Sequence, residues 1–186
     1  MPDLEIVWRA FELRPEPVPT LDPAGDYLRR AWSQSVYPLA ERLGMVMRLP
    51  PVQPRSRLAH EAVAWARSHD RFEPMHKAIF RAFFERGEDI GQADVLAALA
   101  TSIGLGGGGL KRSLERHDHL EEVLADERQA AHCGLSGVPA FVAGGAVLFG
   151  VQPADTLEEF VRLASRASDA TPPQGPLPHV PVRLKK

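Results

Sequence analysis

The sequence predicts an α/β fold in which a small β-sheet is interrupted by a large all-α insertion. Three observations predict it: a period of two in the apolar residues near the start, helical spacing through the middle, and short β-rich runs before one last helical stretch. With 186 residues and 44% hydrophobic content, the chain has the size of a single domain.

The first element is expected to be a strand over residues 4–13, because LEIVWRAFEL alternates between two faces. The next twelve residues, 14–25, contain four prolines and predict a surface loop. Residues 27–43 have helical spacing after Asp26, a candidate cap, and Pro38 is expected to kink this helix or to start a new turn within it.

Further helices are expected where apolar residues recur at three- and four-residue intervals. Their predicted ranges are 57–69 after Ser56 as N-cap, 73–86, 93–104, and one or two helices within 110–133. Three phenylalanines on the 73–86 stripe suggest core, and Met45 and Met47 are expected to pack the same insertion. In the glycine-rich stretch 104–113, Gly104 and Gly109 have the separation of a phosphate loop, but Leu110 precedes Lys111 and no Ser or Thr directly follows the lysine. The stretch also follows a helix, so it predicts a flexible interhelical loop.

After Gly134 the period changes back. VPAFVAG and AVLFG, separated by Gly144 and Gly145, predict two strands joined by a tight hairpin, and a last helix is expected after Pro153. The predicted domain therefore covers residues 1–170, with the helical insertion at about 26–133. Residues 171–186 predict a mobile, proline-rich tail.

The composition of the chain argues against two classes of binding partner. The formal charge is -2, which provides no basic field for nucleic acid, and no stretch approaches the roughly 20 apolar residues that span a bilayer. The sequence therefore predicts a cytoplasmic protein without nucleic-acid or membrane partners. It contains one cysteine, Cys133, so no intrachain disulfide can form, and a dithiol mechanism needs a second sulfur from elsewhere.

The most informative candidate site is Val138 with Pro139, where a Gly-Val-Pro leads directly into a short strand. An ordinary turn with an edge-strand proline is the alternative interpretation. This segment resembles the cis-proline loop of thioredoxin-fold proteins. The phrases VWRAFELRPE, LAHEAVAWA, HKAIFRAFFERGEDIG and GVQPADTLEEFV also resemble FrnE-type members of the DsbA family, a likeness that runs from about residue 4 to 164.

The resemblance implies a thioredoxin-like fold, a thiol or disulfide substrate (a protein or glutathione), and substrate binding by Val138 and Pro139. The family begins with a strand that ends in Cys-x-x-Cys at the start of a helix, and this sequence contains neither. We therefore expect a thiol-disulfide oxidoreductase that lacks its first strand and helix and is inactive as given, with no catalytic and no metal-binding residues of its own. Whether the chain is an enzyme stays open.

Two alternatives stay open beside this expectation. One is a glutathione-dependent isomerase or transferase related to the 2-hydroxychromene-2-carboxylate isomerases, which share the fold. The other is a non-catalytic peptide-binding remnant. No cofactor is expected, although glutathione stays open as a co-substrate and a homodimer as the assembly.

The remaining candidate residues favour structural roles. Cys133 is expected to be a buried, inert thiol, because a reactive thiolate would need a nearby cation and His132 is the only adjacent candidate. His117 and His119 lie two positions apart, on different faces of a helix, and are expected to be solvated and not metal ligands.

Overall fold

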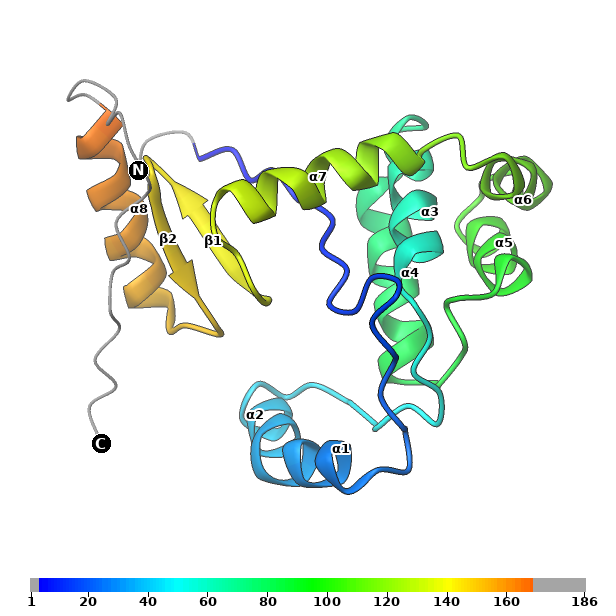
Figure 1. The fold of residues 1–186 in the computed structure, drawn as a ribbon, viewed down its shortest axis with the longest axis horizontal. Coiled ribbons are helices and arrows are strands. Elements are labelled where there is room, and N and C mark those ends of the chain that lie inside the picture. The colour runs from blue at the N-terminus through cyan, green and yellow to red at the C-terminus, as the bar shows by residue number, and fades with distance from the viewer. Residues whose placement is uncertain (1–3, 169–186) are drawn as a thin grey trace. The chain divides into compact units, whose positions relative to one another are not determined.

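The structure is a computed structural model that describes residues 4–168, the last three of them by their backbone alone. It divides into two compact units, Met1–Ala125 and Asp126–Lys186. In chain order the elements are α1 (Asp26–Ala31), a π-helix (Trp32–Val36), α2 (Tyr37–Arg42), α3 (Arg57–Arg67), α4 (Phe72–Phe84), α5 (Ala93–Ser102), α6 (Gly107–Arg116), α7 (Leu120–His132), β1 (Ala140–Ala143), β2 (Ala146–Phe149) and α8 (Ala154–Ser168) (Figure 1).

The prediction of a strand over residues 4–13 is wrong. This segment has no regular secondary structure, and the sheet of the described residues consists of β1 and β2 alone. Leu4, Ile6 and Trp8 are all exposed. A strand exists only by hydrogen bonding to a neighbour, so an alternating sequence without a partner strand stays irregular.

The first helical region follows the expected loop and matches the predicted range 27–43 closely. It consists of α1, the π-helix and α2 in direct succession, and Pro38 lies in the first turn of α2 as expected. Proline has no amide to donate to the preceding turn, which is consistent with a wider π turn just before it. Asp26 is the first residue of α1 and not its cap; the N-cap position is Gly25.

The helices α3 to α6 form the core of the first unit, and α3, α4 and α5 were predicted in position. Its buried members are apolar and include one aromatic ring: Ala59, Ala62, Trp65, Ala66, Met75, Ile79, Ala82, Ile90, Leu96, Leu99, Ala100, Leu110 and Leu114. The expectation that the phenylalanines of α4 form the core is wrong in part. Met75, Ile79 and Ala82 occupy the buried face of α4, whereas Phe80 is exposed.

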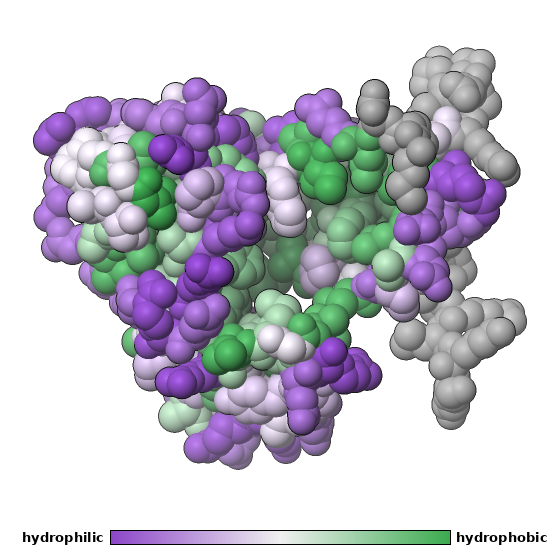
Figure 2. Space-filling view, turned by 180° about the vertical axis from the view of Figure 1, so that it is seen from behind, coloured by the Kyte–Doolittle hydropathy of each residue, from purple (hydrophilic) through white to green (hydrophobic). Residues whose placement is uncertain are grey.

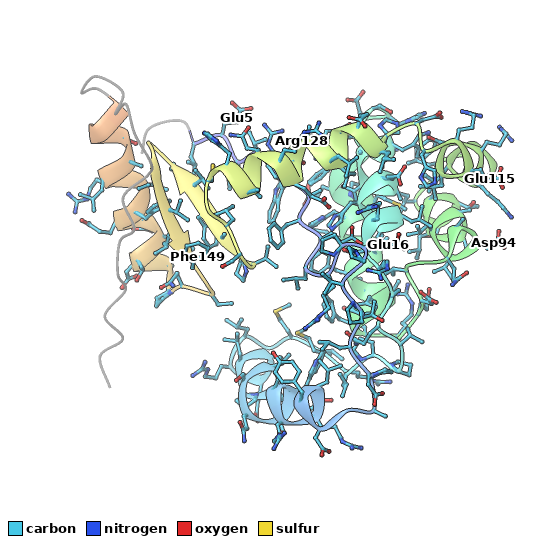
Figure 3. The ribbon with its side chains drawn as sticks, in the orientation of Figure 1. Glu5, Glu16, Asp94, Glu115, Arg128 and Phe149 are labelled. Atoms are coloured by element: carbon cyan, nitrogen blue, oxygen red, sulfur yellow. The ribbon has the colours of Figure 1, made fainter. Side chains whose placement is uncertain are left out.

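The glycine-rich stretch is also different from the expected flexible loop, because α6 begins within it at Gly107. A Cβ atom on Gly107 would lie 2.3 Å from the carbonyl oxygen of Ala97 and 2.4 Å from Oγ1 of Thr101. The glycine therefore permits the close approach of α6 to α5. The same two helices are joined by an ion pair between Lys111 and Asp94, which lies at the start of α5 (Figure 3).

We predict opposite effects for two neighbouring glycine substitutions in α6. Gly107→Ala should lower the free energy of unfolding by about 1–3 kcal/mol, because the methyl group has to push α5 and α6 apart. Gly108→Ala should raise it by about 0.5–1 kcal/mol, since its Cβ meets nothing closer than Nη1 of Arg112 at 3.6 Å and alanine favours the helix. Urea denaturation measures both values, and equal signs would contradict the packing argument.

The second unit contains the predicted hairpin. β1 and β2 are antiparallel with Ala140 opposite Phe149 and Ala143 opposite Ala146, and the two turn residues Gly144 and Gly145 have φ values of 52° and 76°. Positive φ at both positions is what a two-residue hairpin turn requires. α8, which begins directly after Pro153, packs against β1.

Hydrophobic side chains lie on the surface where the chain leaves α2. Leu43, Met45 and Val46 are exposed, and the space-filling view shows apolar surface in this region (Figure 2). The expected packing role of Met45 is therefore wrong, while Met47 is half-buried. The predicted tail at 171–186 lies outside the described residues. Within residues 4–168, no helix combines the length and the apolar composition needed to cross a membrane.

Candidate substrate-binding site

Val138 and Pro139 lie immediately before β1, at the open end of the hairpin. The peptide bond between them is cis. The carbonyl of Pro139 accepts a hydrogen bond from the amide of Gly150 at 2.8 Å, so the hairpin ladder extends one residue beyond each strand. Val138 is 51% exposed. The sequence-predicted pair is therefore placed at an accessible strand start.

The hydrogen-bond pattern decides which backbone groups point away from β2. In an antiparallel pair, alternate residues of a strand bond to the partner. Since Pro139 bonds to Gly150, the groups of Phe141 also point toward β2, and those of Ala140 point to the opposite edge. Val138 precedes this strand, and none of the backbone hydrogen bonds among residues 4–168 involves its amide or carbonyl. The edge can therefore accept another extended segment.

Cys133 follows α7 and is half-buried, where a fully buried thiol was expected. Its neighbour His132 is exposed. The part of the chain that the structure describes holds no group of three or more His, Cys, Asp or Glu residues that could bind a metal ion. Cys133 is thus the only thiol that this sequence offers.

His117 is exposed as expected and His119 is half-buried, but each histidine contacts a carboxylate and neither lies within a helix. His117 ends α6 with a φ of 54°, and its Nδ1 lies 3.0 Å from Oε1 of Glu61, whose side chain is only 1% exposed. His119 precedes α7, and its Nδ1 lies 3.5 Å from Oε2 of Glu122. The first of these contacts connects the end of α6 to the buried face of α3.

A second buried carboxylate belongs to Glu12, which sequence reasoning did not single out. Oε2 of Glu12 lies 2.9 Å from Nη2 of Arg57 at the start of α3. For Glu61 a signal was available, because it lies three residues after Leu58 and four before Trp65, on the apolar stripe of α3. For Glu12 the sequence offered no comparable signal.

Aromatic rings form a continuous row along one face of α4. Phe72, His76, Phe80 and Phe84 recur every four residues, with successive ring centroids 5.3, 4.7 and 5.7 Å apart. The ring of Trp8 lies 5.1 Å from that of His76. Burial among these rings lowers the pKa of His76, because the charged imidazolium loses hydration there.

This lowered pKa predicts a pH dependence of stability. An unfolded histidine has a pKa of about 6.5, so below that pH the unfolded chain binds a proton that folded His76 resists. The contribution of His76 should be complete above this pH and should be lost as the pH falls through the folded pKa. Urea midpoints at neutral and mildly acidic pH should therefore differ less in His76→Phe than in the unmodified chain. His132→Gln, at an exposed position, should keep the full difference.

Comparisons with known proteins identify the family. A family model described as DSBA-like thioredoxin domain matches residues 1–162. The uncharacterized protein YwbO of Bacillus subtilis (strain 168) is 33% identical over 163 residues, which cover 86% of this chain and 82% of that protein. The crystal structure of a probable DsbA oxidoreductase from Streptomyces coelicolor superposes with a TM-score of 0.68 at 24% identity, covering 93% of this chain and 79% of the other.

The family model covers most of the sequence, and the structural match is to a DsbA fold. This chain therefore belongs to the DSBA-like thioredoxin domain family and has a thioredoxin-like fold.

Proposed function

We propose that this chain works in thiol–disulfide exchange by binding an extended thiol or disulfide substrate at Val138. The observation that carries the proposal is that Val138 is exposed just before β1 and that no backbone hydrogen bond among residues 4–168 involves its amide or carbonyl. An extended peptide can add to such an edge as a further strand, with its backbone supplying affinity and its side chains specificity. Family membership supports thiols or disulfides as the substrate class.

The reactive sulfur needs a separate source in this proposal. Thiol–disulfide exchange of the DsbA type uses two cysteines, and the sequence contains only Cys133. We propose that a strand outside this sequence supplies a Cys-x-x-Cys pair. Within residues 4–168 the alternating segment 4–13 has no partner strand, and this supports a neighbouring strand from another source. The low cysteine content fits the reducing cytoplasm, where we place the protein.

Peptide binding tests the first part of the proposal. Two peptides share one sequence that contains an S-methylated cysteine. In one peptide the backbone amides of the odd-numbered residues are N-methylated, and in the other those of the even-numbered residues. Only one of the two patterns leaves the amides that face Val138 free to donate, so only that peptide should shift the NMR signal of the Val138 amide. Equal binding of both peptides would show side-chain contact without strand pairing, and binding of neither would refute the edge as a substrate site.

Insulin reduction by dithiothreitol tests the second part. The chain and its Cys133→Ser variant should both leave the rate at that of the buffer, because one thiol cannot complete a dithiol cycle. A faster rate in the chain that Cys133→Ser abolishes would contradict an outside source of the cysteines. The peptide experiment does not depend on this outcome, so the two parts can fail separately.

A further inference from the structure

A cavity of about 550 Å³ lies in the first unit. Its walls come from the segment before α1, the start of α3, the turn before α5 and the connection between α6 and α7. This volume lies within the range of sites that hold small molecules in proteins. The thiol–disulfide proposal makes no use of it.

One wall of the cavity is a charged pair whose acidic member is buried. The side chain of Glu12 is 2% exposed, and neither of its carboxylate oxygens accepts a well-directed hydrogen bond, although Arg57 lies at 2.9 Å. Nε of Arg57 is buried and also lacks an acceptor. A buried carboxylate with so few hydrogen bonds strongly favours a nearby positive charge. Glu12 therefore fixes the position of the Arg57 guanidinium at the cavity wall.

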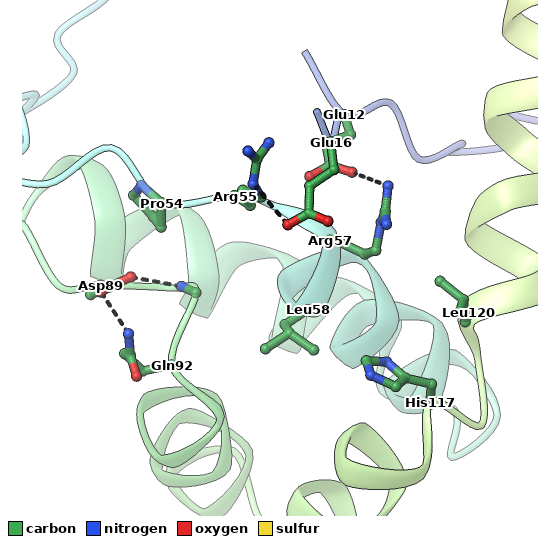
Figure 4. A pocket seen from close by; sticks show the side chains of 11 residues that line it. Glu12, Glu16, Pro54, Arg55, Arg57, Leu58, Asp89, Gln92, His117 and Leu120 are labelled. Carbon is green, nitrogen blue, oxygen red and sulfur yellow. Dashed lines mark hydrogen bonds and ion pairs between the residues drawn. The ribbon is translucent and has the colours of Figure 1, made fainter. Parts of the chain in front are cut away.

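A second charged pair stands beside the first. Oε1 of Glu16 lies 3.4 Å from Nε of Arg55, and Nη1 of Arg55 donates to the carbonyls of Arg14 and Val18. The Glu16 side chain is 72% exposed, so its carboxylate remains open to a ligand. Figure 4 shows the carboxylates of Glu12 and Glu16 between the guanidinium groups of Arg55 and Arg57. Each of the two arginines thus lies within ion-pair distance of one carboxylate.

We propose that this cavity binds a free α-amino acid with an apolar side chain. Its carboxylate would bind to Arg57 and its ammonium group to Glu16, while the side chain would lie against Leu58 and Leu120, which also line the cavity. An α-amino acid carries its two opposite charges on one carbon, which matches two receptor groups of opposite sign placed side by side. Glu12 is a positioning residue in this proposal, because it acts through Arg57.

The polarity of α3 supports the same orientation. Arg57 and Leu58 lie in its first turn, and its N-cap residue Ser56 makes no capping hydrogen bond with its side chain. The amides at a helix start favour an anionic group, so the ligand carboxylate belongs at this wall. A ligand with only negative charge would meet the carboxylates of Glu16 and Asp89, and a purely cationic ligand would meet both arginines. A zwitterion avoids both conflicts.

The test compares three probes by calorimetric titration: L-leucine, 4-methylpentanoate, which lacks the ammonium group, and 3-methylbutylamine, which lacks the carboxylate. Leucine should bind at least about tenfold more tightly than either analogue, because each analogue leaves one receptor group without its partner. Equal affinities for the three probes, or no measurable binding of leucine, would overturn the proposal.

Variants assign the contacts. Glu16→Gln, an exposed substitution, should weaken leucine binding about tenfold and leave 4-methylpentanoate unchanged, because that probe has no ammonium group. Glu73→Gln on α4, also exposed, should change neither affinity. Glu12→Gln should weaken the binding of both probes that carry a carboxylate. The thermal melting of this variant is measured first, because the substitution alters a buried ion pair. If Glu16→Gln weakened the binding of leucine and of 4-methylpentanoate equally, the assigned orientation of the ligand would be wrong.

Discussion

A Gly144→Ala variant is expected to lose about 2–4 kcal/mol of unfolding free energy, from two separate costs. The φ of Gly144 is +52°, a region that is unfavourable for any residue with a Cβ atom. In addition, a Cβ at this position would lie 2.4 Å from the carbonyl oxygen of Ala164 and 2.8 Å from its Cα, both on the backbone of α8. Because backbone atoms cannot rotate away, α8 has to move off the hairpin.

Gly134→Ala separates these two costs. Gly134 has a φ of +68°, but nothing lies within 4 Å of its added Cβ. This control should therefore lose only the conformational part, roughly 1–2 kcal/mol. Urea denaturation measures both variants, and hydrogen exchange should show faster opening of β1 and α8 in Gly144→Ala alone. Equal losses in the two variants would show that contact with Ala164 contributes nothing.

The helices could be predicted from the sequence because their hydrogen bonds are local. Each helix from α3 to α5 appears within a few residues of its expected range, since the apolar period and the helix share the same neighbours. The hairpin could also be predicted from the sequence, because Gly144 and Gly145 mark the turn between two adjacent apolar segments. Residues 4–13 carry an equally clear pattern, but a strand also needs a partner, and local sequence says nothing about whether one is present.

The candidate site residues also differ in whether they can be predicted from local sequence. Val138 and Pro139 were predicted because a proline directly before an apolar run is a local signal. The Glu12–Arg57 and Glu61–His117 pairs join residues that are far apart in the chain, in the second case by 56 positions. No period or spacing connects such residues. A charged residue on an apolar stripe, as at Glu61, indicates that a partner exists but not which residue it is.

The Glu61–His117 pair should account for a measurable part of the stability of the first unit. His117→Ala removes the imidazole and leaves the Glu61 carboxylate, 1% exposed, without its hydrogen-bond partner. An unpaired buried carboxylate destabilises by about 2–4 kcal/mol, and alanine at the positive φ of His117 adds a backbone cost. Glu61→Leu should change stability much less, because an apolar side chain replaces both the charge and its desolvation.

A double-mutant cycle removes the backbone contribution from this comparison. The cost of alanine at a φ of 54° is present in His117→Ala and in the double variant, so it cancels in the coupling energy. We expect a coupling of about 1–3 kcal/mol, with the double variant more stable than His117→Ala alone. The neighbouring pair Arg116–Asp118, whose side chains are 63% and 37% exposed, is the control and should give less than about 1 kcal/mol. If the two cycles gave equal couplings, burial of Glu61 would not be what makes His117 important, and the contact would be only a turn-stabilising hydrogen bond at the end of α6.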